Sequence, residues 1–167
     1  AGFEAAMEEQ RARAQKASQF GTDYNASLTS EVCTDFAGYE RDVAPGQIVE
    51  LFVAGEVAQN ASEGDNVTVV LDNTPFYAES GGQVGDTGVL KAPLGEILVK
   101  DTVKLDKAFA HTGTVIGQIK LNEHVEAHVD HQRRDAIRLN HTGTHILHAA
   151  LRNVLGEHVT QKGSLVD

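Results

Sequence analysis

The sequence predicts a mainly β protein with flanking helices, in the α+β class, built around a small antiparallel β-barrel. Three observations support this prediction. Short runs of β-branched and apolar residues, separated by Gly, Asn, Asp and Pro, occupy the middle of the chain. At Asp130 the hydrophobic period changes from two to about 3.6, which indicates a helix after the last of these runs. The composition, with 41% hydrophobic and 23% charged residues, is that of a globular chain.

The first residues, 2–18, are rich in Ala, Glu, Gln and Arg and predict a helix. Phe3, Met7 and Ala14 lie near helical spacing, so its apolar face is narrow. We expect this helix to pack against a part of the protein that precedes it. Because the chain begins without Met and without a secretory pattern, we interpret it as an excised segment of a larger protein.

Strands follow between residues 47 and 129. Val125, Ala127 and Val129 alternate with Glu126 and His128, which is the pattern of a strand with one buried face. Several short strands in succession favour a closed barrel, because closure removes exposed strand edges. The predicted strands are Gln47–Val53, Asn66–Leu71, Thr87–Leu90, Glu96–Leu105, Phe109–Ile116 and Val125–Val129.

The last predicted element is helical and extends from His131 to a stop at Gly156. Asp130 can cap its first turn, and Gly commonly follows the last turn of a helix. Asn140 is a candidate breaking point that would divide the segment into two helices. Apolar residues at helical spacing form a stripe along it: Ile137, Ile146, Leu147, Ala150, Leu151, Val154 and Leu155.

Charge and cysteine content exclude several classes of protein. The net charge is −10, which argues against nucleic-acid binding by the whole surface. Residues 1–130 hold nine basic and 21 acidic side chains, whereas residues 131–167 hold five and three, with five of the eight histidines. The single Cys33 excludes an internal disulfide and is expected to be a small buried side chain. No apolar run approaches the roughly 18 residues that span a bilayer.

Two histidines four residues apart, His141 and His145, are candidate metal ligands. On a helix their imidazoles can turn toward one point, as two ligands of a tetrahedral zinc ion do. Thr142 stands where a zinc peptidase of the HExxH type has its general base, so the segment is not that motif. A zinc site needs three or four protein ligands, so the others lie outside this chain or include His148, which is on the same face. A chance pair of histidines is the alternative.

A second candidate site is the glycine-rich segment Thr74–Gly88. Four glycines within eight residues permit positive φ angles and a close approach of a ligand to the backbone. Glu79, Gln83 and Asp86 are candidates for hydrogen bonds to ribose or amine groups. A tight connection between barrel strands accounts for the same composition. The segment has neither the Lys of a Walker A loop nor the helix that follows a dinucleotide-binding fingerprint.

Residues 158–164 follow the helix and form a third candidate site. Gln161 can turn back toward the histidine face, and Lys162 is available to a phosphate. The alternative is a solvated turn. Three arginines are candidates for contacts with an RNA backbone, with an exposed helix face as the alternative: Arg133, Arg134 and Arg138.

In this order and spacing, these segments resemble the alanyl-tRNA synthetase family, and the resemblance covers essentially the whole chain. The family usually has Ala where this sequence has Gly143, a change that lowers helix propensity and touches no ligand. The matching segments are Gly2–Glu4, Thr74–Asp86, Arg138–His145, Leu147–Leu151 and Gln161–Leu165.

The resemblance implies three parts. Residues 1–20 would end a helix of an upstream tRNA-recognition domain, residues 21–130 would form the β-barrel domain, and residues 131–167 would begin a truncated α/β editing domain. The parent enzyme would attach alanine to tRNA(Ala) with ATP and magnesium, and would hydrolyse mischarged Ser-tRNA(Ala) and Gly-tRNA(Ala). The resemblance implies a cytoplasmic enzyme without membrane attachment, oligomeric through a domain outside this chain. This chain would hold no aminoacylation site and would be inactive by itself.

The resemblance also assigns site residues. His141 and His145 would be zinc ligands, completed by a Cys and a His from a later Cys-x-x-x-His stretch. Gln161 would line the editing pocket near the tRNA acceptor end, because a site that hydrogen-bonds the hydroxyl of serine rejects analogues that lack it. The Gly81-Gly82-Gln83 loop would face this pocket from the barrel. Two alternatives stay open: a non-catalytic barrel that binds RNA or protein, and a free-standing metal hydrolase using His141, His145 and His148.

Overall fold

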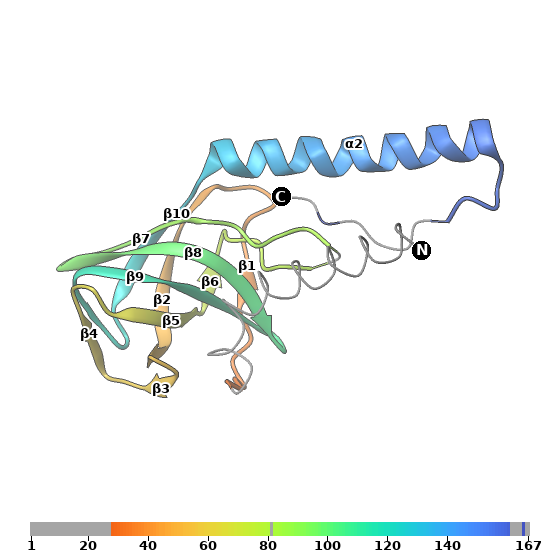
Figure 1. The fold of residues 1–167 in the computed structure, drawn as a ribbon. Helices are drawn as coiled ribbons and strands as arrows, with labels where there is room; N and C mark the ends of the chain where they lie inside the picture. The colour runs from red at the N-terminus through yellow and green to blue at the C-terminus, as the bar shows by residue number, and fades with distance from the viewer. Residues whose placement is uncertain (1–27, 81, 161–164, 166–167) are drawn as a thin grey trace.

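The computed structural model describes residues 28–80, 82–160 and 165. Within that part of the chain, a β-barrel is followed by one long helix (Figure 1), so the predicted α+β class with a barrel is confirmed. The helix predicted for residues 2–18 lies outside the described residues. The strands are β1 (Asp35–Phe36), β2 (Val43–Val53), β3 (Glu56–Val57), β4 (Asn60–Ser62), β5 (Asn66–Leu71), β6 (Asn73–Thr74), β7 (Gly88–Ala92), β8 (Gly95–Leu105), β9 (Ala108–Lys120) and β10 (His124–Val129), and the helix is α2 (His131–Leu155).

Six of the described strands close into an antiparallel barrel in the order β10, β7, β8, β9, β5 and β2. The last strand, β10, completes the ring because it pairs with β7 on one side and with β2 on the other. All six correspond to predicted strands, with ends that differ by a few residues. The short strands were not predicted: β3 pairs with β2, β4 pairs with β9, and β1 and β6 form a separate parallel pair.

The barrel interior is filled by the apolar side chains that alternate along its strands. On β10, Val125, Ala127 and Val129 are buried, as the alternating pattern predicted. Ile97 on β8 and Leu71 on β5 are fully buried in the same cluster. Burying one such aliphatic side chain contributes roughly 1.5–3 kcal/mol, so this interior is the main source of the stability of the barrel.

The barrel also buries an ionisable side chain that the sequence did not single out, His111 on β9. Its Nδ1 lies 3.2 Å from the carbonyl oxygen of Val69 and its Nε2 lies 2.8 Å from Oγ1 of Thr74. A carbonyl can only accept, so Nδ1 carries the proton and Nε2 accepts from the hydroxyl group. Burial lowers the pKa of His111 to about 4, and the ring is therefore neutral at pH 7.

The helix α2 has the predicted ends. Asp130 accepts a hydrogen bond at 3.1 Å from the backbone N–H of Arg133, and the N–H of Gly156, at φ 109°, donates to the carbonyl of Arg152. The predicted break at Asn140 is wrong, because α2 is continuous from His131 to Leu155. Asn costs under about 1 kcal/mol in a helix interior, which is too little to interrupt a helix that is capped at both ends.

Most of α2 extends beyond the barrel (Figure 1). Within the described helix, only Arg134 and Ile137 are buried, while Ile146 and Val154 on the predicted apolar stripe are 65% and 81% exposed. In the described residues, no helix is both long enough and apolar enough to cross a membrane.

The predicted burial of Cys33 is also wrong, since this side chain is exposed. It lies in the irregular segment before β1, where the next residue, Thr34, turns inward instead. Oγ1 of Thr34 donates to the carbonyl of Leu71 at 2.8 Å, and this bond anchors the segment with Cys33 on its outer side.

Candidate functional site

The predicted metal ligands His141 and His145 contact each other on α2. Their Nε2 atoms are 2.9 Å apart and their ring centroids are 4.7 Å apart. His141 is half-buried and His145 is exposed. Nδ1 of His141 is buried without a hydrogen-bond partner among the described residues. The two rings therefore converge on one point, as the spacing predicted.

The pair fits half of a zinc site. In a tetrahedral site with Zn–N bonds of about 2.05 Å, two nitrogen ligands lie about 3.3 Å apart, so a small rotation of either ring reaches that geometry. In the part of the chain that the structure describes, no group of three His, Cys, Asp or Glu side chains is arranged to hold a metal ion, and His148 does not complete such a group. Further ligands would have to come from elsewhere.

The glycine-rich segment is a loop that connects β6 to β7 and is pressed against β8. Its backbone turns at Ser80 and Gln83, which pair through N–H to carbonyl distances of 3.2 and 3.1 Å, with Gly82 at φ 83° between them. Gly85 lies so close to β8 that a Cβ atom would stand 2.1 Å from the carbonyl oxygen of Thr102. The loop is therefore a tightly packed connection, and its glycines at 82 and 85 are required by the backbone path.

The prediction that Asp86 in this loop is available to a ligand is wrong. Asp86 is 2% exposed, and its Oδ2 accepts hydrogen bonds from the N–H of Tyr77 at 2.7 Å and from Nε of Arg134 at 2.9 Å. Its carboxylate is thus occupied within the protein. Glu79 is exposed and Gln83 is half-buried, so their predicted ligand contacts stay predictions.

Arg134 is likewise unavailable to RNA, because it is 4% exposed. Its guanidinium donates to the carboxylates of Asp86 and Asp42 and to the carbonyl groups of Gly38 and Pro75. The next residue on the N-terminal side, Arg133, donates from Nη1 to the carbonyl of Gly85 at 3.0 Å. No local motif could have indicated this network, since Asp86 and Asp42 are 48 and 92 residues away in the sequence. Arg138 remains exposed.

A further acidic group, Asp101 on β8, lies under the loop. Burial raises the pKa of Asp101, a hydrogen bond from the N–H of Thr102 lowers it, the nearby carboxylate of Glu79 raises it and Arg133 lowers it. The carboxylates of Asp101 and Glu79 therefore lie near the guanidinium of Arg133 where the loop meets β8. Sequence spacing did not reveal this grouping.

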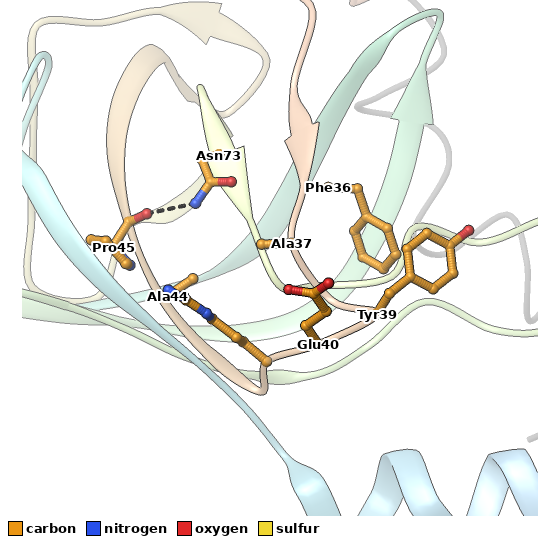
Figure 2. A pocket seen from close by; sticks show the side chains of 8 residues that line it. Phe36, Ala37, Tyr39, Glu40, Ala44, Pro45 and Asn73 are labelled. Carbon is orange, nitrogen blue, oxygen red and sulfur yellow. Dashed lines mark hydrogen bonds between the residues drawn. The ribbon is translucent and has the colours of Figure 1, made fainter.

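A cavity of about 390 Å³ opens beside the turn between β1 and β2 (Figure 2). Phe36 and Tyr39 form one wall with ring centroids 4.9 Å apart, and Asn73 donates to the carbonyl of Pro45 on the other side. Glu40 lies between these walls. The sequence did not indicate this cavity, because its residues come from three separate segments.

Two other predicted sites lie outside the described residues. They are Gly81 in the glycine-rich loop and residues 161–164, which include Gln161 and Lys162. Their predicted roles therefore stay predictions.

Sequence comparisons define the class of protein first. The profile of the tRNA synthetases class II (A) matches residues 1–133, and the chain belongs to this family. Over 166 residues the chain is 55% identical to an alanine–tRNA ligase of Idiomarina loihiensis, and over 168 residues it is 54% identical to one of Colwellia psychrerythraea. Each comparison covers 99% of this chain and 19% of the relative. The resemblance to alanyl-tRNA synthetases is confirmed.

The two kinds of comparison differ in extent. The family profile ends at residue 133, in the first turn of α2, whereas the similarity to both ligases continues through the histidine pair. The chain spans only 19% of the length of these curated relatives, so it corresponds to one part of such an enzyme.

Proposed function

We propose that this chain belongs to an alanine–tRNA ligase and there joins the tRNA-binding part to an editing site that hydrolyses mischarged Ser-tRNA(Ala) and Gly-tRNA(Ala). The observation that supports this proposal most directly is the convergence of His141 and His145, with Nε2 atoms 2.9 Å apart, on a helix attached to the barrel. The similarity to alanine–tRNA ligases extends over this helix. ATP-dependent aminoacylation would take place in a part of the enzyme outside these residues.

The two histidines would supply neutral nitrogen ligands to zinc, with two further ligands from outside the described chain. Zinc bound there supplies a positive charge that orients the aminoacyl ester, or that polarises its carbonyl or an attacking water. In the hydrolysis, the water oxygen bonds to the carbonyl carbon, the bond from that carbon to the ribose oxygen breaks, and the ribose oxygen takes a proton. Gln161 and the Gly81-Gly82-Gln83 loop would line the pocket and bind the substrate at the acceptor end of tRNA(Ala).

The test compares three histidine variants of a full-length ligase that contains this chain. His141→Ala and His145→Ala are expected to lose zinc and to lower the rate of Ser-tRNA(Ala) hydrolysis at least about 100-fold. Mutating even a residue that only hydrogen-bonds a metal ligand typically lowers metal affinity or activity about 10–100-fold. His148→Ala is the matched control and keeps both properties. Zinc is measured by elemental analysis, and aminoacylation is measured to show that the ligase is folded. Full zinc content and full hydrolysis in His141→Ala would contradict the proposal.

A protein made of these 167 residues by itself provides a second test. With two of the four ligands, it is expected to bind no stoichiometric zinc and to leave Ser-tRNA(Ala) intact. Tight zinc binding that disappears in His148→Ala would instead favour a free-standing metal hydrolase. Stoichiometric RNA binding without zinc would favour a non-catalytic barrel module.

A further inference from the structure

We propose that Asp86 and Arg134 are a positioning pair that holds the glycine-rich loop under the histidine face of α2, so that the loop and His141 act on one substrate. This inference rests on the proposed editing function. It assigns no contact with substrate to either residue.

The histidine pair lies on the same face of α2 as Arg134. At 100° per residue, His141 and His145, seven and eleven residues after Arg134, lie within about 20° of its direction. Arg134 and Ile137 are the buried residues of the described helix, so this face is the one directed at the barrel. The histidine pair therefore continues the barrel-facing side of α2 beyond the contact.

The start of α2 holds the glycine-rich loop at both of its ends. Arg134 Nη2 donates to the carbonyl of Pro75 at one end of the loop, and the same guanidinium binds the carboxylate of Asp86 at the other end. Arg133 donates to the carbonyl of Gly85 beside it. Two consecutive residues of α2 thus fasten both ends of the loop, with Gly82 and Gln83 between them. In Figure 1 the connection from β6 to β7 extends in the same direction as α2.

The ion pair between Asp86 and Arg134 is buried. Asp86 and Arg134 have side chains that are 3% and 4% exposed, and a buried ion pair is seldom more stabilising than apolar residues of the same volume. The role of the pair is better explained by the geometry that it imposes, because a guanidinium that donates from several nitrogens is fixed in one orientation. The pair therefore determines how the loop lies against the helix.

Asp42 offers a matched control. It accepts from Nη1 of the same guanidinium at 3.0 Å and also contacts Nδ1 of His131 at 2.7 Å. It lies just before β2, so its contacts with Arg134 and His131 tie α2 to the barrel and not to the glycine-rich loop. A loss of stability alone would be seen in variants of both carboxylates, whereas a loss of loop position would be seen only in variants of Asp86.

The experiment compares Asp86→Asn with Asp42→Asn in the full-length ligase. Asp86→Asn is expected to lower kcat for Ser-tRNA(Ala) hydrolysis about tenfold or more, with zinc content and aminoacylation unchanged, because displacement by 1 Å can cost 10²-fold. Asp42→Asn is expected to stay within about twofold of the parent in kcat, because the backbone hydrogen bonds from Val129 to the carbonyl of residue 42 and from Asp130 to the carbonyl of Thr87 still hold the start of α2. Equal kcat losses in both variants, or an unchanged kcat in a folded Asp86→Asn, would overturn the proposal.

A second variant covers the case in which Asp86→Asn does not fold. Arg134→Lys retains the charge and loses the planar guanidinium that donates to both Asp86 and Pro75, so it is expected to lower kcat with zinc retained. Full kcat in Arg134→Lys would contradict the positioning role. His141→Ala in the same assay separates the two proposals: if it hydrolyses Ser-tRNA(Ala) fully, the editing function itself is wrong.

Discussion

The barrel and α2 differ in where they bury apolar side chains. Among the described residues, every buried hydrophobic side chain except Ile137 lies in the barrel or its loops. The second half of α2, in contrast, exposes Ile146, Leu147, Val154 and Leu155, although their spacing is that of a buried stripe. The difference shows that regular apolar spacing indicates a face suited to packing, whereas burial requires a second surface. The barrel provides that surface by closing on itself.

The largest expected difference in unfolding free energy is between an Ile→Ala substitution in the barrel and the same substitution on α2. Ile97→Ala, at a fully buried position of β8, is expected to lower the free energy of unfolding by about 2–5 kcal/mol. Ile146→Ala, at a position that is 65% exposed on α2, is expected to change it by less than about 0.5 kcal/mol. Urea unfolding of the two variants and the parent measures both values. Equal losses would show that α2 is packed as tightly as the barrel.

A smaller effect is expected from pH, and it belongs to the barrel. The pKa of His111 is about 4 in the folded protein against 6.5 when unfolded, so below pH 6.5 the unfolded state binds the proton first. The contribution of His111 to stability is therefore complete above pH 6.5 and falls by about 3 kcal/mol between pH 6.5 and 4, with no further loss below.

Unfolding in urea at several pH values measures this dependence. His111→Gln is the control, because Gln retains a donor and an acceptor and does not titrate in this range. The parent is expected to lose more stability than His111→Gln as the pH falls to 4. Parallel pH profiles for the two proteins would contradict the assignment.

The smallest expected effect has the opposite sign and belongs to α2. At Gly143 a Cβ atom would meet nothing within 4 Å, so Gly143→Ala introduces no clash and should stabilise the helix by about 0.5–1 kcal/mol. Circular dichroism and Tm are expected to show more helix and a slightly higher midpoint. A lower Tm would mean that Gly143 is needed for close packing that the described residues do not show.

The regular elements were predictable because their residues carry local patterns. Short apolar runs between turn residues located the strands of the barrel, alternation supported the last of them, and Asp130 and Gly156 located the ends of α2. The predicted break at Asn140 is wrong because the low helix propensity of Asn costs little in a helix that is capped at Asp130 and Gly156. Two-residue strands such as β1 and β6 carry too few residues for any pattern, and they form only because the chain brings them together.

The candidate site was predictable in part. The contact between His141 and His145 follows from helical spacing, so the sequence was sufficient for it. The predicted ligand contact of Asp86 and the predicted RNA contact of Arg134 are wrong, because the folded chain pairs these two side chains across 48 residues of sequence. His111 was missed for a related reason, since Thr74, one of its partners, is 37 residues away.

The junction between β10 and α2 has a mechanical consequence. The strand that completes the barrel ends at Val129 and the helix starts at His131, so one residue separates them. At about 1.5 Å per residue, His141 stands about 15 Å from that junction, and a tilt of about 10° there would displace it by about 3 Å. Metal ligands tolerate errors of about 0.2 Å. The helix therefore amplifies a small rotation at its first residue. The position of its histidines depends on how rigidly β10 closes the barrel at the junction with α2.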